Sequence, residues 1–274
     1  MSTQSDNPVE PTREAAEPLA AEPVVAEPVV AEAVAAGATS RDAAHWATGV
    51  HTLQVGAVPP EAVNLNVAGR RLVGPIQGFG KLWQKSYRVD LGDAAVPPAD
   101  LVTTWKQNFQ RFWPERNWFY GPLTGIAPGE VALLNLTMPG RLLLSTGVLV
   151  LYADDESFTF MTPEGHIFAA WITFSAAEQD GHTIAQVQVL LRAGDPLYET
   201  ALALGGHRKE DRFWQQTLES LARHFGTEGV VETTVVCVDR RRQWSNAKNV
   251  WRNAAVRSAL HTLARPRRRS RGTR

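Results

Sequence analysis

The chain has 274 residues, an apolar fraction of 44% and 28 basic against 28 acidic side chains, so its net charge is zero. This apolar content suffices for a large core, and the single cysteine, Cys237, excludes a disulfide framework and a thiolate metal site. The polar and acidic start is not a secretory signal, and the longest apolar run, 142–152, is too short to span a bilayer. We therefore expect a soluble, cytoplasmic protein.

The two ends of the chain carry opposite charges. Residues 1–40 repeat Ala-Glu-Pro with Arg13 as their one basic side chain, and the recurring prolines block helix hydrogen bonds, which predicts a disordered acidic arm. Residues 265–274 are rich in arginine and contain no acid. We expect this basic tail, Arg265 to Arg274, to be disordered. It can contact an anionic membrane surface or nucleic acid, pair with the acidic arm, or have no specific partner.

Secondary structure is expected to begin gradually after the acidic arm. Residues 41–80 are interpreted as an extension that packs on the main domain. An alternating apolar pattern predicts a strand over 81–91, and Leu, Trp and Phe side chains at helical spacing predict a helix over 98–113. Residues 115–128 are expected to form a loop or a short helix, and 131–137 a strand.

Four apolar runs then follow in meander spacing. They cover 142–152, 156–161, 166–174 and 182–191, and short turns rich in Asp, Gly and Pro separate them. Such connections are too short for parallel crossovers, so the runs are predicted to pair as antiparallel strands. Apolar side chains alternate with Gln in the last run, which indicates a sheet covered on one side.

A long helical pattern, 195–225, follows the last of these strands. The pair Gly205-Gly206 interrupts it, and Gly226 is a normal helix stop. Beyond it, 230–238 is predicted to be a further strand and 244–263 an imperfect amphipathic helix.

The order of strand, helix, antiparallel strands and long C-terminal helix resembles that of the START-like, or Bet v 1-like, helix-grip superfamily (SRPBCC). The run Phe158–Phe168 is similar to a hairpin of small uncharacterised bacterial members, the DUF1990-like proteins. The resemblance implies an α+β fold in which a curved antiparallel sheet wraps around the C-terminal helix and leaves an apolar cavity. Members of the superfamily bind lipids, sterols or polyketides, and a few catalyse cyclisation or dehydration.

With this resemblance the chain divides into five parts. They are the acidic arm 1–40, the extension 41–80, a helix-grip ligand-binding domain 81–226, a C-terminal strand and amphipathic helix 227–264, and the basic tail 265–274.

Large apolar side chains are expected to line the cavity, because ligand pockets are mostly apolar and aromatic. The alternative is that the same side chains fill the core, since protein interiors are close-packed. The predicted lining residues are Trp105, Phe109, Tyr120, Trp171, Val187, Val189, Trp214 and Leu218.

Two histidines are candidate acid–base groups. His166 follows Glu164 at a predicted hairpin tip, where a carboxylate can raise the basicity of an imidazole; the alternative is a turn without a catalytic role. His207 lies among basic residues where the long helix begins, which suits an anion contact or ordinary helix capping. No metal-ligand spacing and no cofactor motif is present, and the glycines near Gly78 do not match a phosphate loop.

Three functions follow from these observations. The first is non-catalytic binding of a hydrophobic or amphipathic small molecule. The second is a polyketide cyclase- or dehydratase-like enzyme on the same scaffold, with His166 or His207 as its acid–base group. The third is an interaction protein whose basic tail contacts membrane or nucleic acid while its domain is packed solid. The sequence indicates no cofactor and does not decide the oligomeric state.

Overall fold

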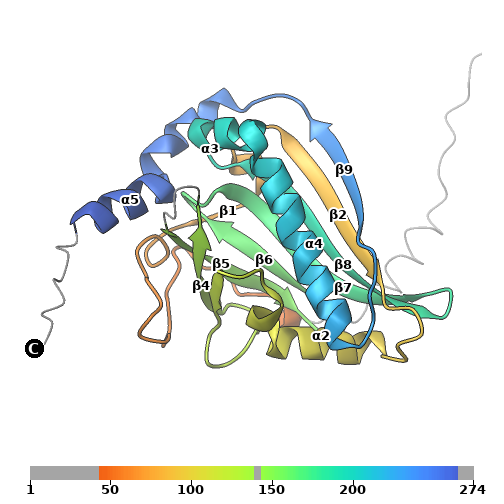
Figure 1. Ribbon diagram of the computed structural model, residues 1–274. Helices are drawn as coiled ribbons and strands as arrows, with labels where there is room; N and C mark the ends of the chain where they lie inside the picture. Colours follow the sequence, from red (N-terminus) through yellow and green to blue (C-terminus); the bar gives the residue numbers. More distant parts are fainter. Residues whose placement is uncertain (1–42, 139–142, 265–274) are drawn as a thin grey trace, which may run out of the picture. The chain divides into compact units, whose positions relative to one another are not determined.

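A computed structural model describes residues 43–138 and 143–264 of the chain. The predicted acidic arm and basic tail lie outside these described residues. The described part is built on one antiparallel sheet that curves around a long helix (Figure 1). Its strands follow in the order β3-β4-β5-β6-β7-β8-β2-β9, and β1 pairs with the end of β6. The strands are β1 (Leu72–Val73), β2 (Leu82–Asp90), β3 (Trp118–Tyr120), β4 (Val131–Thr137), β5 (Leu143–Ala153), β6 (Ser157–Pro163), β7 (Phe168–Gln179), β8 (His182–Ala193) and β9 (Glu232–Asp239).

The long helix α4 lies across the concave face of the sheet (Figure 1). It buries Trp214, Leu218 and Leu221, whose spacing of four and three residues places them on one side of a helix. The predicted fold class, a curved antiparallel sheet wrapped around a C-terminal helix, is therefore confirmed. The helical segments are η1 (Ala43–His45), η2 (Pro75–Gln77), α2 (Pro98–Gln107), η3 (Phe109–Phe112), α3 (Pro196–Ala201), η5 (Leu202–Gly206), α4 (His207–His224), η6 (Trp244–Arg252) and α5 (Ala254–Ala264).

Strand β8 shows why the sheet has an inner and an outer face. Val187 and Val189 are buried in the main core, whereas Gln186 and Gln188, which alternate with them along the strand, are half-buried on the outside. Successive side chains of a strand point to opposite faces, so this alternation fixes which face meets α4. The predicted one-sided pattern of 182–191 agrees with this arrangement.

Strands β4 and β5 are instead buried on both faces. Ala132 and Leu134 face the main core, while Leu133 and Leu149 pack on the outer face against Leu53 and other residues of the N-terminal extension. A strand covered on both sides has no position for a solvated side chain, which accounts for the continuous apolar sequence here. The segment expected to be a loop or short helix, 115–128, contains the short edge strand β3.

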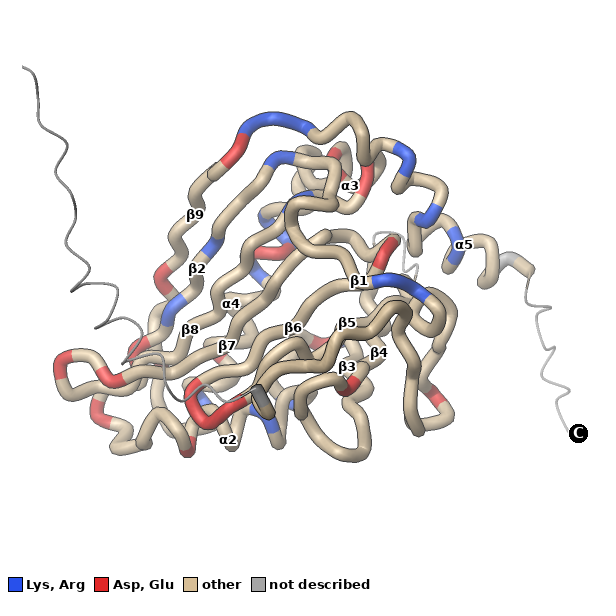
Figure 2. The backbone as a smooth tube through the Cα atoms, turned by 180° about the vertical axis from the view of Figure 1, so that it is seen from behind, with Lys and Arg blue, Asp and Glu red and all other residues tan. Residues whose placement is uncertain are grey.

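The C-terminal segment also packs on the domain. β9 extends the sheet beside β2, and η6 and α5 then cross the end at which the β6–β7 hairpin lies. The backbone N–H of Ala254 donates to the carbonyl of Gly165, and the hydroxyl of Ser258 accepts from the backbone N–H of Ser145. Seen from behind, the basic residues between β9 and η6 form a continuous run at the edge of the molecule (Figure 2). Among the residues that the structure describes, no helix combines the length and apolarity needed to cross a membrane.

Candidate functional site

A cavity of about 440 Å³ lies between the concave face of the sheet and the first turns of α4. The sheet contributes apolar side chains from adjacent strands, among them Phe160 on β6, Ile172 on β7 and Val189 on β8. The helix contributes Phe213 and Trp214. Because Ile172 and Val189 are register partners, they lie on the same face of the sheet and form a continuous apolar wall.

The rim of the cavity includes a break in the helical chain. The segment η5 separates α3 from α4, and Gly205 adopts a positive φ of 113° that favours glycine over other residues. Leu204, Gly205 and Gly206 all line the cavity, and the side chain of Leu204 is 84% exposed. An apolar side chain thus stands in solvent at the entrance, beside a backbone that departs from α-helical geometry at Leu204 and Gly205.

Next to the cavity the same sheet and helix enclose a solid aromatic core. Trp105 is fully buried and meets Phe158 and Phe174 edge-on, with ring centroids 5.9 and 5.3 Å apart. Phe109 contacts the same two rings at 5.6 and 5.1 Å. Such edge-to-face clusters add to the stability that burial alone provides. None of these four rings lines the cavity.

The structure therefore separates the residues predicted to line the cavity. Val189 and Trp214 are in its wall. The buried side chains of Trp105, Phe109, Val187 and Leu218 belong to the solid core and lie outside the cavity lining.

The two remaining predicted residues lie on the outer face of the sheet. Trp171 is 44% exposed, because its neighbour Ile172 points into the cavity and successive side chains alternate. Tyr120 pairs with Leu133 and packs in the cluster beneath the N-terminal extension. Neither side chain lines the cavity.

His166 lines the cavity and is 4% exposed. Its Nδ1 lies 3.0 Å from the backbone nitrogen and 3.1 Å from the carbonyl oxygen of Phe168, so the backbone of Phe168 holds this nitrogen in either tautomer. Burial lowers the pKa of His166 to about 4, because desolvation disfavours the imidazolium. The imidazole is thus neutral at neutral pH, and its Nδ1 is already engaged by the backbone.

An ion cluster is buried where β2 meets the first turn of α4. Lys85 is 1% exposed, and its Nζ lies 2.9 Å from Glu210 Oε2 and 2.7 Å from Asp211 Oδ1. The hydroxyl of Tyr87 donates to the same Asp211 oxygen at 2.7 Å. Burial, the charge of Glu210 and the bond to Asp211 all raise the pKa of Tyr87, which keeps the phenol protonated.

Two polar atoms in the cavity wall lack a hydrogen-bond partner among the described residues. They are Oε1 of Glu210 and Nε1 of Trp113, and both atoms are buried. A buried acceptor without a partner costs about 1–3 kcal/mol, and more when it is charged. Unpaired buried groups are few in native proteins and require an explanation.

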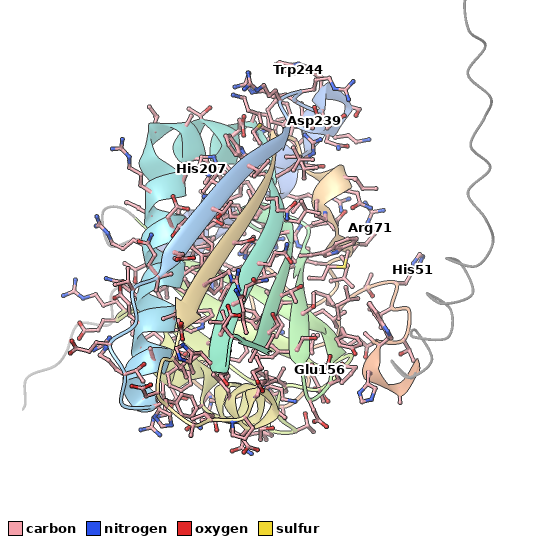
Figure 3. The ribbon with its side chains drawn as sticks, turned by 90° about the vertical axis from the view of Figure 1, so that its right-hand side faces the viewer. His51, Arg71, Glu156, His207, Asp239 and Trp244 are labelled. Atoms are coloured by element: carbon pink, nitrogen blue, oxygen red, sulfur yellow. The ribbon has the colours of Figure 1, made fainter. Side chains whose placement is uncertain are left out.

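His207, the second candidate acid–base residue, lies at the start of α4 (Figure 3). Its ring packs against Trp83 with centroids 5.2 Å apart, and its Nδ1 is 3.8 Å from Glu210 Oε2. His207 does not line the cavity. Of the two histidines, only His166 can therefore meet a molecule bound there.

Sequence reasoning missed Glu210 and Lys85, although one signal was present. Lys85 lies between Trp83 and Tyr87 in the alternating strand 81–91, on the side that carries the apolar residues. A lysine on the buried face of a strand requires a buried carboxylate, since an unpaired charge is too costly there. No comparable signal identifies which acid pairs with it.

The chain was compared with families of proteins and with curated proteins. A scan against models of protein families finds no match, and a search of curated proteins finds no relative. The narrower likeness to DUF1990-like proteins therefore stays a prediction.

A search of solved structures finds proteins whose backbones superpose on part of this chain. The crystal structure of Ara h 8.0201 is 14% identical over 53% of this chain and 97% of that chain, with a TM-score of 0.37. A START superfamily protein from Mycobacterium smegmatis is 16% identical over 54% and 98%, with a TM-score of 0.35. The major latex-like protein 151 from Panax ginseng is 8% identical over 53% and 99%, with a TM-score of 0.36. At these scores we draw no argument from the likenesses, and the helix-grip fold rests on the strand order and helix placement described above.

Proposed function

We propose that this protein binds a hydrophobic or amphipathic small molecule, lipid-, sterol- or polyketide-like in shape, between the sheet and α4 without transforming it. The observation that carries this proposal is the apolar cavity of about 440 Å³. Its volume falls within the range of about 300–1,000 Å³ that is usual for small-molecule sites. A space of this size beside a tightly packed aromatic core is not needed for folding, because cavities destabilise the proteins that contain them.

The composition of the wall supports a largely apolar ligand with few polar groups. Phe160, Ile172 and Val189 form the floor, and Phe213 of α4 lies across from them. The polar members of the wall are few, which is typical of sites where burial provides affinity and isolated polar contacts orient the ligand. The exposed Leu204 at the rim extends the apolar surface to the entrance.

The enzymatic alternative requires a group that accepts or releases a proton inside the cavity. His166 is the predicted candidate that faces it, but its Nδ1 is held by the backbone of Phe168 and its pKa is lowered to about 4. A general base works best with a pKa near the operating pH. An imidazole that stays neutral and is held by the backbone is poorly suited to proton transfer at neutral pH, and this supports binding over catalysis. The third alternative depends on the basic tail, which lies outside the described residues.

Native mass spectrometry of the purified protein is the first test, followed by extraction of any bound molecule. A graded test then uses straight-chain alcohols from hexanol to dodecanol that compete with an apolar fluorescent probe. Each added methylene should raise the affinity about fourfold until the cavity is full, because burying one methylene is worth about 0.8 kcal/mol. A protein that takes up neither probe nor alcohol, with no dependence on chain length, would contradict the proposal.

A further inference from the structure

Glu210 uses only one of its two carboxylate oxygens. Oε2 accepts from Lys85 Nζ at 2.9 Å, whereas Oε1 is buried and has no hydrogen-bond partner among the described residues. The residue is 7% exposed, and it is part of the cavity wall. Glu210 therefore combines an unpaired, buried carboxylate oxygen with a place in the wall of the cavity where the proposed ligand lies.

Neutralising Lys85 does not explain Glu210. Asp211 already lies 2.7 Å from Lys85 Nζ, and it is held in place by the hydroxyl of Tyr87. The cluster thus contains two carboxylates for one lysine. His207 approaches Oε2, the oxygen that Lys85 already binds, at 3.8 Å and does not serve Oε1. Among the residues that the structure describes, none serves Oε1.

We propose that the ligand carries a hydrogen-bond donor, a hydroxyl or an ammonium group, and that Oε1 of Glu210 accepts it. This inference rests on the proposed function, and it names the chemistry of the ligand's polar end. A donor would satisfy Oε1, and hydrogen bonds to a charged acceptor are stronger than those between neutral groups. A carboxylate or phosphate end would meet Glu210 as a like charge at low local dielectric and is disfavoured.

This inference reverses the anion contact that the basic residues around His207 suggested from the sequence. Lys209 also borders the cavity, but its side chain is exposed, and exposed charges are screened by water and salt. Glu210 is buried, so its charge acts on the ligand with little screening. The buried carboxylate therefore determines the preference, and the solvated ammonium of Lys209 does not.

The test compares four molecules that share one alkyl chain and differ at the end: decanol, decylamine, decyl methyl ether and decanoate. Each competes with an apolar fluorescent probe bound to the full chain. We expect decanol and decylamine to bind at least about tenfold more tightly than the ether, which has the oxygen but no donor. Decanoate should bind most weakly. Equal affinities for decanol and its ether would overturn the inference while leaving the proposed function intact.

Two substitutions test whether Glu210 causes the preference for a ligand with a hydrogen-bond donor. Glu210→Gln keeps the shape of the side chain and replaces an acceptor-only group with an amide. It should reduce the preference for decanol over the ether by about tenfold and improve decanoate binding. Glu219→Gln makes the same change at an exposed position of α4. It should alter neither the preference for decanol over the ether nor the binding of decanoate. If E210Q does not fold, the comparison of the four molecules on the unaltered protein still shows whether the cavity prefers a ligand with a hydrogen-bond donor.

The outcomes separate two kinds of failure. If none of the four molecules displaces the probe and the probe itself does not bind, the proposed function fails, and this inference fails with it. If all four bind with equal affinity, or E210Q retains the preference for a donor, the cavity binds ligands without the help of Glu210 and this inference alone is wrong.

Discussion

The same sheet and the same helix enclose a filled half and a hollow half. In the filled half, Trp105 and its phenylalanine partners meet edge-on, beneath the second part of α4 where Leu218 and Leu221 are fully buried. In the hollow half, Phe213 and Trp214 of the first part of α4 face the cavity. Both halves are rich in aromatic rings, so aromatic content does not distinguish a core from a ligand site.

What distinguishes the two halves is the chemistry of their walls. The rings that contact Trp105 are the apolar rings of Phe158 and Phe174, and the Nε1 of Trp105 is itself buried without a hydrogen-bond partner among the described residues. The wall of the hollow half contains His166, Trp113 and Glu210, two of which present unpaired polar atoms. A region that serves only stability gains from close packing and loses from unpaired polar groups. The hollow half lacks the close packing of the filled half, and its wall contains a carboxylate and an imidazole that can meet a ligand.

Truncating one tryptophan in the filled half should have the largest effect. Trp105→Ala removes a fully buried ring and should lower the free energy of unfolding by about 3–5 kcal/mol. Trp171→Ala makes the same change on the outer face, where the side chain is 44% exposed, and should cost about 1 kcal/mol or less. Urea denaturation of both variants measures the difference. Equal losses would show that the assignment of the two rings to core and surface is wrong.

The hollow half should respond to acid through His166. Its pKa is about 4 in the folded protein against 6.5 for an exposed imidazole, so only the unfolded chain binds a proton between these values. Stability from this group is complete above pH 6.5 and is lost as the pH falls toward 4, by about 3 kcal/mol in total.

The matched variant is His166→Asn, whose side-chain oxygen can still accept from the Phe168 backbone N–H. Unfolding free energies of the two proteins should converge or cross as the pH is lowered from 6.5 to 4, because the variant has no imidazole to protonate. Parallel curves over this range would mean that His166 is accessible to protons in the folded state.

Most of the fold could be predicted because its elements have strong periodic signals. Strand 131–137 and the helix over Lys209–Phe225 match β4 and α4 closely, since each buries a regular face. Short element β3 was missed, because three residues are too few to show a period. This edge of the sheet depends on the pairing of β3 with β4, which local sequence does not reveal.

The cavity could be expected from the sequence, but its wall could not be assigned. Trp171 and Ile172 are adjacent apolar residues in one strand, and only the register, Ile172 against Val189, decides which of them faces inward. Trp105 faces inward as predicted, yet neighbouring rings fill the space around it. Periodicity shows the face on which a side chain lies. It does not show whether side chains from other elements pack against that side chain or leave a space beside it.

A pair of valines on β8 offers the finest test of the boundary between the two halves. Val187 and Val189 lie two residues apart on the same buried face, but only Val189 lines the cavity. Val187→Phe forces a ring into a packed region and should lower the unfolding free energy by about 1–3 kcal/mol. Val189→Phe places the same ring toward the cavity, so its cost in stability should be smaller, while the affinity for an apolar probe should fall at least about tenfold. Thermal denaturation and probe titration of the two variants measure both quantities. If V189F destabilised the protein as much as V187F and left probe binding unchanged, the hollow half would be a packed core and the probe would bind elsewhere.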